Sequence, residues 1–194
     1  MVVEPVELIG RTVRLSPLGV GDAAGLLRAA EPELFKFAVV EPPTWDVEGF
    51  RRYIQWALDM PDRRPFAVRM RESDEVVGTT SYLDIRPAHR GLEMGYTWIA
   101  RAHQGTRVNP ETKYLMLRHA FETLGAVRVQ LKTDARNLHS QRAMEKLGCH
   151  REGVLRHHMI LPDGFIRDSV MYSITNDEWP AVKSQLERRL GSVP

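Results

Sequence analysis

The order of the predicted strands and helices constrains the fold of this chain more than any other feature. Hydrophobic periodicity predicts strands at about Thr12–Leu15, Pro65–Met70, Val76–Ile85, Leu92–Ile99, Ala126–Thr133, Gly153–Leu161 and Ile166–Ile174. It predicts helices at about Gly21–Ala30, Val47–Leu58, Pro110–Thr123, Leu138–Leu147 and Asp177–Leu190. This order is not the regular alternation of a doubly wound fold. We therefore expect an α+β chain with a mixed sheet and helices on both faces.

Length and composition are those of an ordinary globular protein. The 194 residues suit one domain, which we expect to span residues 1–194. The net charge of +2 is too balanced to indicate nucleic-acid binding. One cysteine allows no intrachain disulfide, no apolar run is long enough for a membrane helix, and the N-terminus does not resemble a signal peptide. We expect a cytoplasmic protein that binds neither membrane nor nucleic acid.

The segment His103–Glu111 contains a strongly marked helix start. Asn109 is a preferred N-cap and Pro110 is a preferred first helical residue. Free N–H groups and the positive end of the helix dipole gather at such a start, which is how proteins hold phosphates. Gly105 lets backbone approach a ligand closely. Further donors come from Gln104, Thr106 and Arg107.

The same residues also fit an ordinary capped helix that follows a glycine turn. The segment has no Lys-Ser/Thr pair of a P-loop and no G-x-G-x-x-G pattern. A module that binds nucleotide phosphates is therefore disfavoured, and the choice between an anion site and a plain helix start stays open at this point.

A second helix start follows the strand at Ala126–Thr133. Asn137 is expected to cap it, and Ser140 stands three residues further on. Each residue alone has a purely structural explanation. Together they place an amide and a hydroxyl at a helix start that follows a strand, as the first helix start does. Two such starts beside neighbouring strands would line a cleft with hydrogen-bond donors.

At this point the sequence resembles the GNAT acetyltransferase superfamily, most closely its RimJ/RimL-like branch, which acetylates the N-termini of ribosomal proteins. The segments that carry the resemblance are Gly91–Trp98, Gln104–Glu111, Asn137–Gly148, Arg151–Arg156 and Asp163–Ser173. The Asn-x-x-Ser run that ends in Glu-Lys-Leu-Gly, followed by the Asp-Gly and Arg-Asp pairs, is the most specific part. The correspondence covers about Val6–Trp179.

The resemblance implies a GNAT fold whose strongly twisted sheet has about seven strands and is splayed between the fourth and the fifth. Acetyl-CoA would lie in that opening. Its pantetheine arm would pair with backbone near Trp98, Ile99 and Ala100, and Asn137 would contact the arm. The pyrophosphate would sit on the segment that comprises Gln104, Gly105, Thr106, Arg107, Val108 and Asn109.

Two positions depart from the family pattern. Arg107 and Asn109 stand where the family loop usually has small residues, and a non-glycine residue at a positive φ is unfavourable. Met144 stands where many members have a tyrosine that protonates the leaving thiolate. Within the RimL-like branch a serine three residues after the asparagine is the suggested acid, and Ser140 matches it.

The expected reaction is direct attack of an amine on the thioester of acetyl-CoA. A protein α-amino group has a pKa of about 7.7–8.0, so it needs little help to lose its proton. Glu93, on the strand that borders the opening, is the candidate base or water-holding residue, with a solvated strand carboxylate as the alternative. Backbone N–H near Trp98 and Ile99 would hold the oxyanion, and Ser140 would donate a hydrogen bond to the sulfur.

The remaining reactive side chains have structural explanations. The seven histidines form no metal-ligand pattern, so we expect no metal. His157 and His158 should face opposite sides of a strand, and Cys149 should be part of the core. The aromatic residues of the second helix, Phe50, Tyr53 and Trp56, either form its core stripe or line the acceptor side of the cleft.

The acceptor is not named by the sequence. A ribosomal-protein N-terminus is the first expectation, and aminoglycosides, polyamines and free amino compounds remain open. A non-catalytic acyl-CoA-binding domain is the alternative of a different class, because Met144 cannot act as an acid. Both a monomer and a homodimer are compatible with the sequence.

Overall fold

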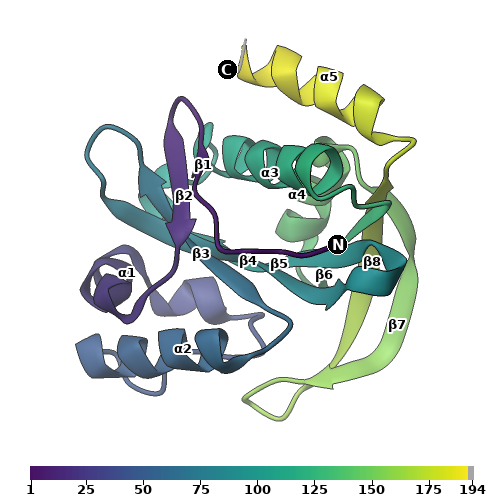
Figure 1. Ribbon diagram of the computed structural model, residues 1–194. Coiled ribbons are helices and arrows are strands. Elements are labelled where there is room, and N and C mark those ends of the chain that lie inside the picture. Colours follow the sequence, from purple (N-terminus) through teal and green to yellow (C-terminus); the bar gives the residue numbers. More distant parts are fainter. Residues whose placement is uncertain (192–194) are drawn as a thin grey trace.

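The computed structural model describes residues 1–191 and contains one eight-stranded sheet (Figure 1). The strands are β1 (Leu8–Ile9), β2 (Val13–Pro17), β3 (Arg64–Met70), β4 (Val76–Arg86), β5 (Gly91–Ile99), β6 (Arg128–Asp134), β7 (His150–Ile160) and β8 (Ile166–Thr175). Their order in the sheet is β1-β2-β3-β4-β5-β6-β8-β7. All neighbours are antiparallel except β5 and β6, which are parallel. The expected mixed sheet is confirmed.

Helices cover both faces of the sheet, as expected. They are α1 (Ala23–Ala29), α2 (Val47–Asp59), α3 (Val108–Arg118), α4 (Leu138–Leu147) and α5 (Trp179–Leu190). Figure 1 shows α1 and α2 on one side of the sheet and α3 and α4 on the other, with α5 above α3. Two cores result: the smaller joins α1 and α2 to the sheet around Phe50 and Trp98, and the larger surrounds α3. Short 3₁₀ segments at Val20–Asp22, Pro32–Phe35, Pro87–His89 and Arg101–His103 complete the elements.

The sheet has one strand more than the seven that the pattern predicted. The additional strand β1 has only two residues, too few to show an alternation, and it pairs with β2 through Leu8 and Leu15. The turn between them needs a glycine, because a Cβ on Gly10 would lie 2.4 Å from Oε1 of Glu111. This hairpin therefore packs directly on the first turn of α3.

Helix α2 starts as the sequence indicated. Asp46 is its N-cap, since its side chain accepts a 2.7 Å hydrogen bond from the N–H of Gly49. Phe50, Tyr53 and Ile54 are buried. The core-stripe interpretation of Phe50 and Tyr53 is confirmed, whereas Trp56 is only half-buried.

The predicted start of α3 is wrong by about two residues. The helix begins at Val108, so Asn109 lies inside its first turn and is not the N-cap. Pro110 tolerates this position because the first four N–H groups of a helix have no partner within it. At the other end, α3 passes at His119–Thr123 into a π-helical turn, and Gly125 ends the segment at a φ of 65°.

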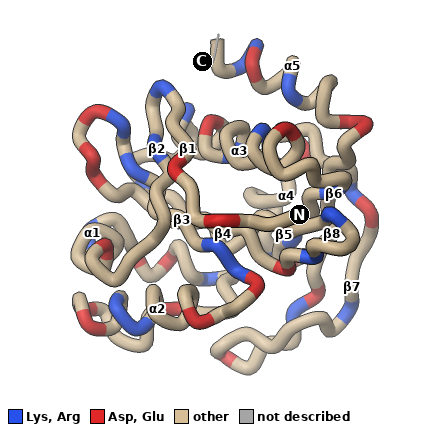
Figure 2. The backbone as a smooth tube through the Cα atoms, viewed as in Figure 1, with Lys and Arg blue, Asp and Glu red and all other residues tan. Residues whose placement is uncertain are grey.

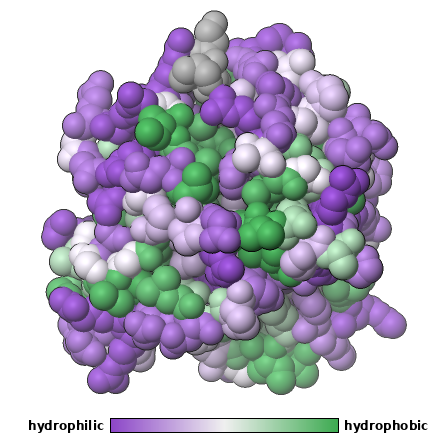
Figure 3. Space-filling model, in the orientation of Figure 1, coloured by the Kyte–Doolittle hydropathy of each residue, from purple (hydrophilic) through white to green (hydrophobic). Residues whose placement is uncertain are grey.

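The surface carries charges of both signs. Figure 2 shows Lys and Arg interspersed with Asp and Glu along the backbone, without a face of one sign in that view. Figure 3 shows mostly polar residues on the same face, with apolar side chains in separate patches. No helix within residues 1–191 is long and apolar enough to cross a membrane.

Candidate active site

The sheet opens in its middle, between β5 and β6. These two strands pair only at Gly91–Glu93 and Arg128–Gln130, although β5 continues to Ile99 and β6 to Asp134. Beyond Glu93, the edge of β5 that faces β6 has no strand partner. Unpaired backbone N–H and C=O groups can form hydrogen bonds, so an extended ligand can bind along this inner edge as an additional strand. The predicted splay between the strands at Leu92–Ile99 and Ala126–Thr133 is confirmed.

Strand β5 carries a bulge beside the opening. Gly95 lies opposite Ser81 and Trp98 opposite Thr79, so that Tyr96 and Thr97 share the single partner position Thr80. Tyr96 has a φ of 48°, which is uncommon for a non-glycine residue. Such strain often marks a functional site, and bulges re-aim backbone groups next to active sites.

The loop between β5 and α3 offers a set of free backbone donors. No described residue accepts a hydrogen bond from the N–H groups of Gly105, Thr106 and Arg107. The loop is held by its own side chains: Gln104 donates to the carbonyl of Ile99 at 3.0 Å, and Thr106 donates to that of His103 at 2.6 Å. Three free N–H groups at a helix start are donors that an anion could use.

The backbone of this loop does not require a glycine at Arg107 or at Asn109. Gly105 alone has a positive φ there, at 73°, whereas Arg107 has a φ of −73° and Asn109 is helical. Arg107 is exposed and Val108 is buried in the core. The amide oxygen of Asn109 is enclosed without a hydrogen-bond partner among the described residues.

The carboxylate closest in sequence to this loop does not face it. Glu111 is 2% exposed and accepts hydrogen bonds from the backbone N–H groups of Arg11 and Thr12 in the β1–β2 turn. Its charge is thus used to stabilise the hairpin.

The start of α4 matches the prediction. The side chain of Asn137 accepts a 3.0 Å hydrogen bond from the N–H of Ser140, and Gly148 ends the helix at a φ of 94°. Since α4 follows β6, its first turn lies at the end of β6 that has separated from β5. The hydroxyl of Ser140 is half-buried and makes no hydrogen bond to the part of the chain that the structure describes.

Trp98, Ile99 and Ala100, which are predicted to contact the pantetheine arm, lie at and just after the end of β5. Trp98 packs between the sheet and α2, where its Nε1 lies 3.4 Å from the hydroxyl of Tyr53. The carbonyl of Ile99 is occupied by Gln104, and the N–H of Ala100 donates to Val77 at 2.8 Å. Any backbone contact that these residues make with a ligand would use groups other than the engaged N–H of Ala100.

Glu93 lies at the apex of the opening and is not a solvated carboxylate. Its side chain is 3% exposed, and both oxygens accept hydrogen bonds from Nζ of Lys132, at 2.7 and 2.6 Å. The amide of Gln130 adds a third hydrogen bond at 3.2 Å. A carboxylate has about four lone-pair positions, so one can still accept from a water or an amine.

A buried arginine beside the bulge was missed in the sequence. The guanidinium of Arg63 lies 4.1 Å from the ring of Tyr96 and 4.9 Å from that of Trp56, and its Nε donates to Ser81. Arg63 forms no ion pair with any described residue, and burial lowers its pKa. No sequence motif predicts its burial. Arg63 follows a proline and an aspartate, a combination that is typical of an exposed turn. Arg63 fixes the ring that occupies the strained position of β5.

A second missed residue is Lys113 on α3. It is 8% exposed, and its Nζ donates a 2.7 Å hydrogen bond to Oγ1 of Thr97 in the bulge of β5. Burial lowers its pKa to about 8. The thiol of Cys149 is near it and buried as predicted, and burial raises the pKa of that thiol to about 12. Lys113 occurs in a helical stretch with weak amphipathicity, so its burial could not be read from the pattern.

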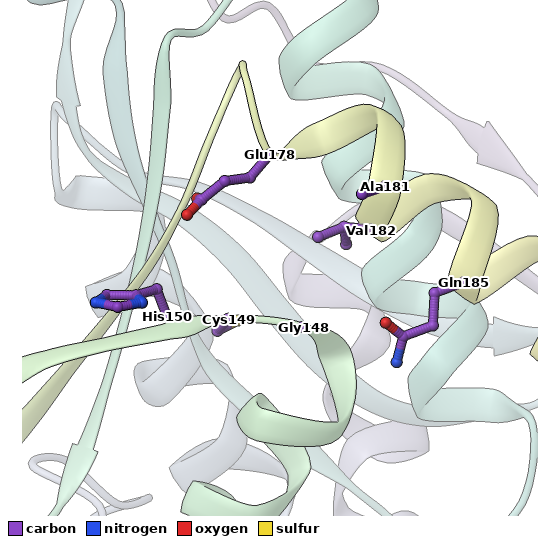
Figure 4. A pocket seen from close by; sticks show the side chains of 7 residues that line it. All are labelled: Gly148, Cys149, His150, Glu178, Ala181, Val182 and Gln185. Carbon is purple, nitrogen blue, oxygen red and sulfur yellow. The ribbon is translucent and has the colours of Figure 1, made fainter.

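One surface hollow includes Cys149, the neighbour of Lys113. It measures about 410 Å³ and lies between the end of α4 and the start of α5, where Gly148, His150 and Gln185 line it (Figure 4). None of the predicted site residues lines it. His157 and His158 are both exposed, as are most residues of the edge strand β7, whose pairing is irregular between Leu155 and Met159. Residues 1–191 contain no cluster of His, Cys, Asp and Glu that could hold a metal ion.

Comparison with known proteins agrees with this architecture. The model of the acetyltransferase (GNAT) domain family matches residues 12–150. "Probable N-acetyltransferase YjcK" of Bacillus subtilis (strain 168) is 30% identical over 179 residues, which are 88% of this chain and 98% of that protein. The chain belongs to the GNAT acetyltransferase family, and it is therefore an enzyme of the acyltransferase class.

Solved structures support the same conclusion. A crystal structure from T. thermophilus, of a protein assigned as an acetyltransferase, is 44% identical and has a TM-score of 0.92, covering 98% of this chain and 100% of that one. The structure of Mycobacterium smegmatis RimJ in complex with CoA-disulfide has a TM-score of 0.82 at 21% identity, covering 97% and 96%. At this identity the second likeness shows the shared fold alone.

Proposed function

We propose that this enzyme transfers the acetyl group of acetyl-CoA directly to an amine, and that residues 1–194 act as one catalytic domain. The observation that carries the proposal is the unpaired inner edge of β5, which lies between two helix starts. Such an edge fits a pantetheine arm, whose amides can pair with backbone near Trp98, Ile99 and Ala100. That a structure of another family member holds CoA-disulfide is consistent with this.

The pyrophosphate is assigned to the loop Gln104–Asn109. The free N–H groups of Gly105, Thr106 and Arg107 supply donors, and the exposed Arg107 guanidinium supplies charge. Val108 contributes backbone only, since its side chain is in the core. Asn137 is assigned to the pantetheine arm from the other side of the opening.

In the proposed reaction the acceptor amine approaches from the side of the sheet that carries Glu93 and Tyr96. Glu93, held by Lys132, accepts a hydrogen bond from the amine or from a water that removes its proton. Backbone N–H groups at the bulge of β5 stabilise the oxyanion. Ser140 donates a hydrogen bond to the sulfur from the start of α4.

The acceptor that we propose is a protein N-terminal α-amino group of the ribosomal-protein type. An α-amino group is partly neutral near pH 7.5, so a site with an ion-paired carboxylate suffices for it. A lysine or polyamine amine, with a pKa of about 10.4, would need a stronger base.

Two experiments test the proposal. A thermal-shift titration should show that acetyl-CoA raises the Tm and that ATP at the same concentration does not. A mass-spectrometric screen should then find acetylation of ribosomal-protein N-terminal peptides above that of polyamines and aminoglycosides. If only a small-molecule amine is acetylated, the proposed protein acceptor is wrong. If acetyl-CoA binds but no amine is acetylated, the result favours a non-catalytic acyl-CoA-binding domain.

A further inference from the structure

Lys113 is a buried amine without a counter-ion. It stands in the second turn of α3 and is 8% exposed. Nothing among the described residues forms an ion pair with it, and its hydrogen bond within that part of the chain joins Nζ to Oγ1 of Thr97 at 2.7 Å. A charged group this well buried is normally paired, so an unpaired ammonium needs an explanation.

The partner of Lys113 places its ammonium at the opening of the sheet. Thr97 belongs to the bulge of β5, next to the strained Tyr96, and its hydroxyl also lies 2.7 Å from that of Thr80. From Met94 onward β5 has no partner on the side of β6. Nζ of Lys113 therefore lies on the α3 side of the opening, beside the stretch of β5 along which the pantetheine arm is placed.

No anion among the described residues balances this ammonium. The groups near it are the hydroxyl of Thr97 on the sheet, which is itself bonded to that of Thr80, and the thiol of Cys149 just before β7. That thiol stays neutral, because burial raises its pKa to about 12. The opening thus holds one potential positive charge that no negative group among the described residues balances.

We propose that Lys113 is the catalytic acid that protonates the departing CoA thiolate, an inference that rests on the proposed acetyl transfer. The amine nitrogen bonds to the acetyl carbon, the carbon–sulfur bond breaks, and its electron pair stays on sulfur. A proton then passes from Nζ of Lys113 to sulfur, giving the thiol and a neutral lysine that regains a proton from water. The acceptor nitrogen loses its own proton on the Glu93 side. Ser140 orients the sulfur but does not supply the proton.

The acidity of Lys113 suits this role better than that of a serine hydroxyl. Burial brings its pKa to about 8, close to the value of about 8.5 for a simple thiol. Proton transfer between groups of similar pKa is the favourable case for general acid catalysis. The assignment also accounts for Met144 at the position where other family members have an acid, since the proton arrives from α3 and not from α4.

The test measures the thiol pKa of bound CoA, which needs no acceptor. The ultraviolet absorbance of the thiolate is followed against pH in the complex of the enzyme with reduced CoA. The matching complex with desulfo-CoA, which lacks the thiol, is subtracted. Wild type should bind CoA and ionise its thiol at a pH at least one unit below that of free CoA. A bound thiol that titrates like free CoA overturns the assignment even if no variant can be made.

Lys113→Met provides the matched comparison, with Lys146→Met on the exposed surface of α4 as the control. In Lys113→Met the thiol pKa of bound CoA should return to or exceed that of free CoA, and kcat should fall by roughly a hundredfold, while the Kd for CoA changes by less than tenfold. Lys146→Met should behave as wild type. If CoA binds both proteins with the same thiol pKa, Lys113 is not the acid although the CoA site stands. If wild type binds neither CoA nor desulfo-CoA, the proposed function fails and this assignment fails with it.

Discussion

Nζ of Lys132 lies 2.6 Å from Oε2 of Glu93, and this ion pair joins the last paired residue of β5 to a residue of β6 two positions beyond the pairing. Both side chains belong to the apex of the opening. Lys132 is more exposed than its partner, at 17% against 3%. The pair therefore marks the boundary between the continuous sheet and the part that opens.

Glu93→Gln should destabilise the protein and reduce its activity. The change leaves the Lys132 ammonium without its carboxylate in a largely buried place, which costs about 1–3 kcal/mol of unfolding free energy. Urea unfolding measures this cost. Lys132→Met and the double variant complete a mutant cycle. The double variant should lose less unfolding free energy than the two single variants lose together. Strictly additive losses would show that the ion pair contributes nothing.

Ser140→Ala and Asn137→Ala should separate catalysis from helix capping. Ser140→Ala should lower kcat more than it weakens acetyl-CoA binding, because its hydroxyl has no structural partner among the described residues. Asn137→Ala removes the cap of α4 and should cost about 1 kcal/mol of stability. Steady-state kinetics with thermal unfolding distinguishes the two. Unchanged turnover in Ser140→Ala would remove the proposed contact to sulfur.

Gly105→Ala should weaken CoA binding, and the chain provides a matched control. Gly105 and Gly125 both have positive φ values, 73° and 65°, and a Cβ at either would meet nothing within 4 Å. Alanine at either position should therefore cost a similar amount, about 1–2 kcal/mol. Only Gly105 belongs to the proposed pyrophosphate loop. Calorimetric titration should show weaker CoA binding in Gly105→Ala alone, and equal affinities would argue against that loop.

The stability of the unliganded enzyme should depend on pH through Lys113. Its pKa is about 8 in the folded protein and about 10.4 in an unfolded chain. Between these values the unfolded chain binds more protons, so the unfolding free energy contributed by Lys113 rises with pH, by at most about 1.4 kcal/mol per unit.

Chemical denaturation of wild type and Lys113→Met from pH 7 to pH 10 measures this dependence. Cys149 acts in the opposite direction, since its raised pKa makes the folded state retain the thiol proton longer. Because the charge of Lys113 lowers the pKa of that thiol, both proteins are compared in a Cys149→Ala background. The unfolding free energy of wild type should therefore increase relative to that of Lys113→Met as the pH rises above about 8. A difference independent of pH would show that Lys113 is not buried as described.

Gly10→Ala should disrupt the contact between the β1–β2 turn and α3. Its Cβ would lie 2.4 Å from Oε1 of Glu111, and it would displace the carboxylate from the N–H groups of Arg11 and Thr12. Thermal unfolding should show a loss of about 1–3 kcal/mol. Gly19→Ala is the control, because nothing lies within 4 Å of a Cβ there. Equal Tm values for the two variants would contradict this account.

The sequence alone determined the order of elements, the two donor-rich helix starts and the family. Local signals sufficed for these: alternation in β6, the Asp46 and Asn137 caps, and the glycines that end α4 and the segment after α3. The tertiary structure decided what no local signal contains. It moved the start of α3 to Val108, turned Glu111 toward a hairpin a hundred residues away, and buried Lys113 and Arg63 against β5. Burial and ionisation depend on groups that only folding brings together, so the charges of this site could not be assigned from the sequence.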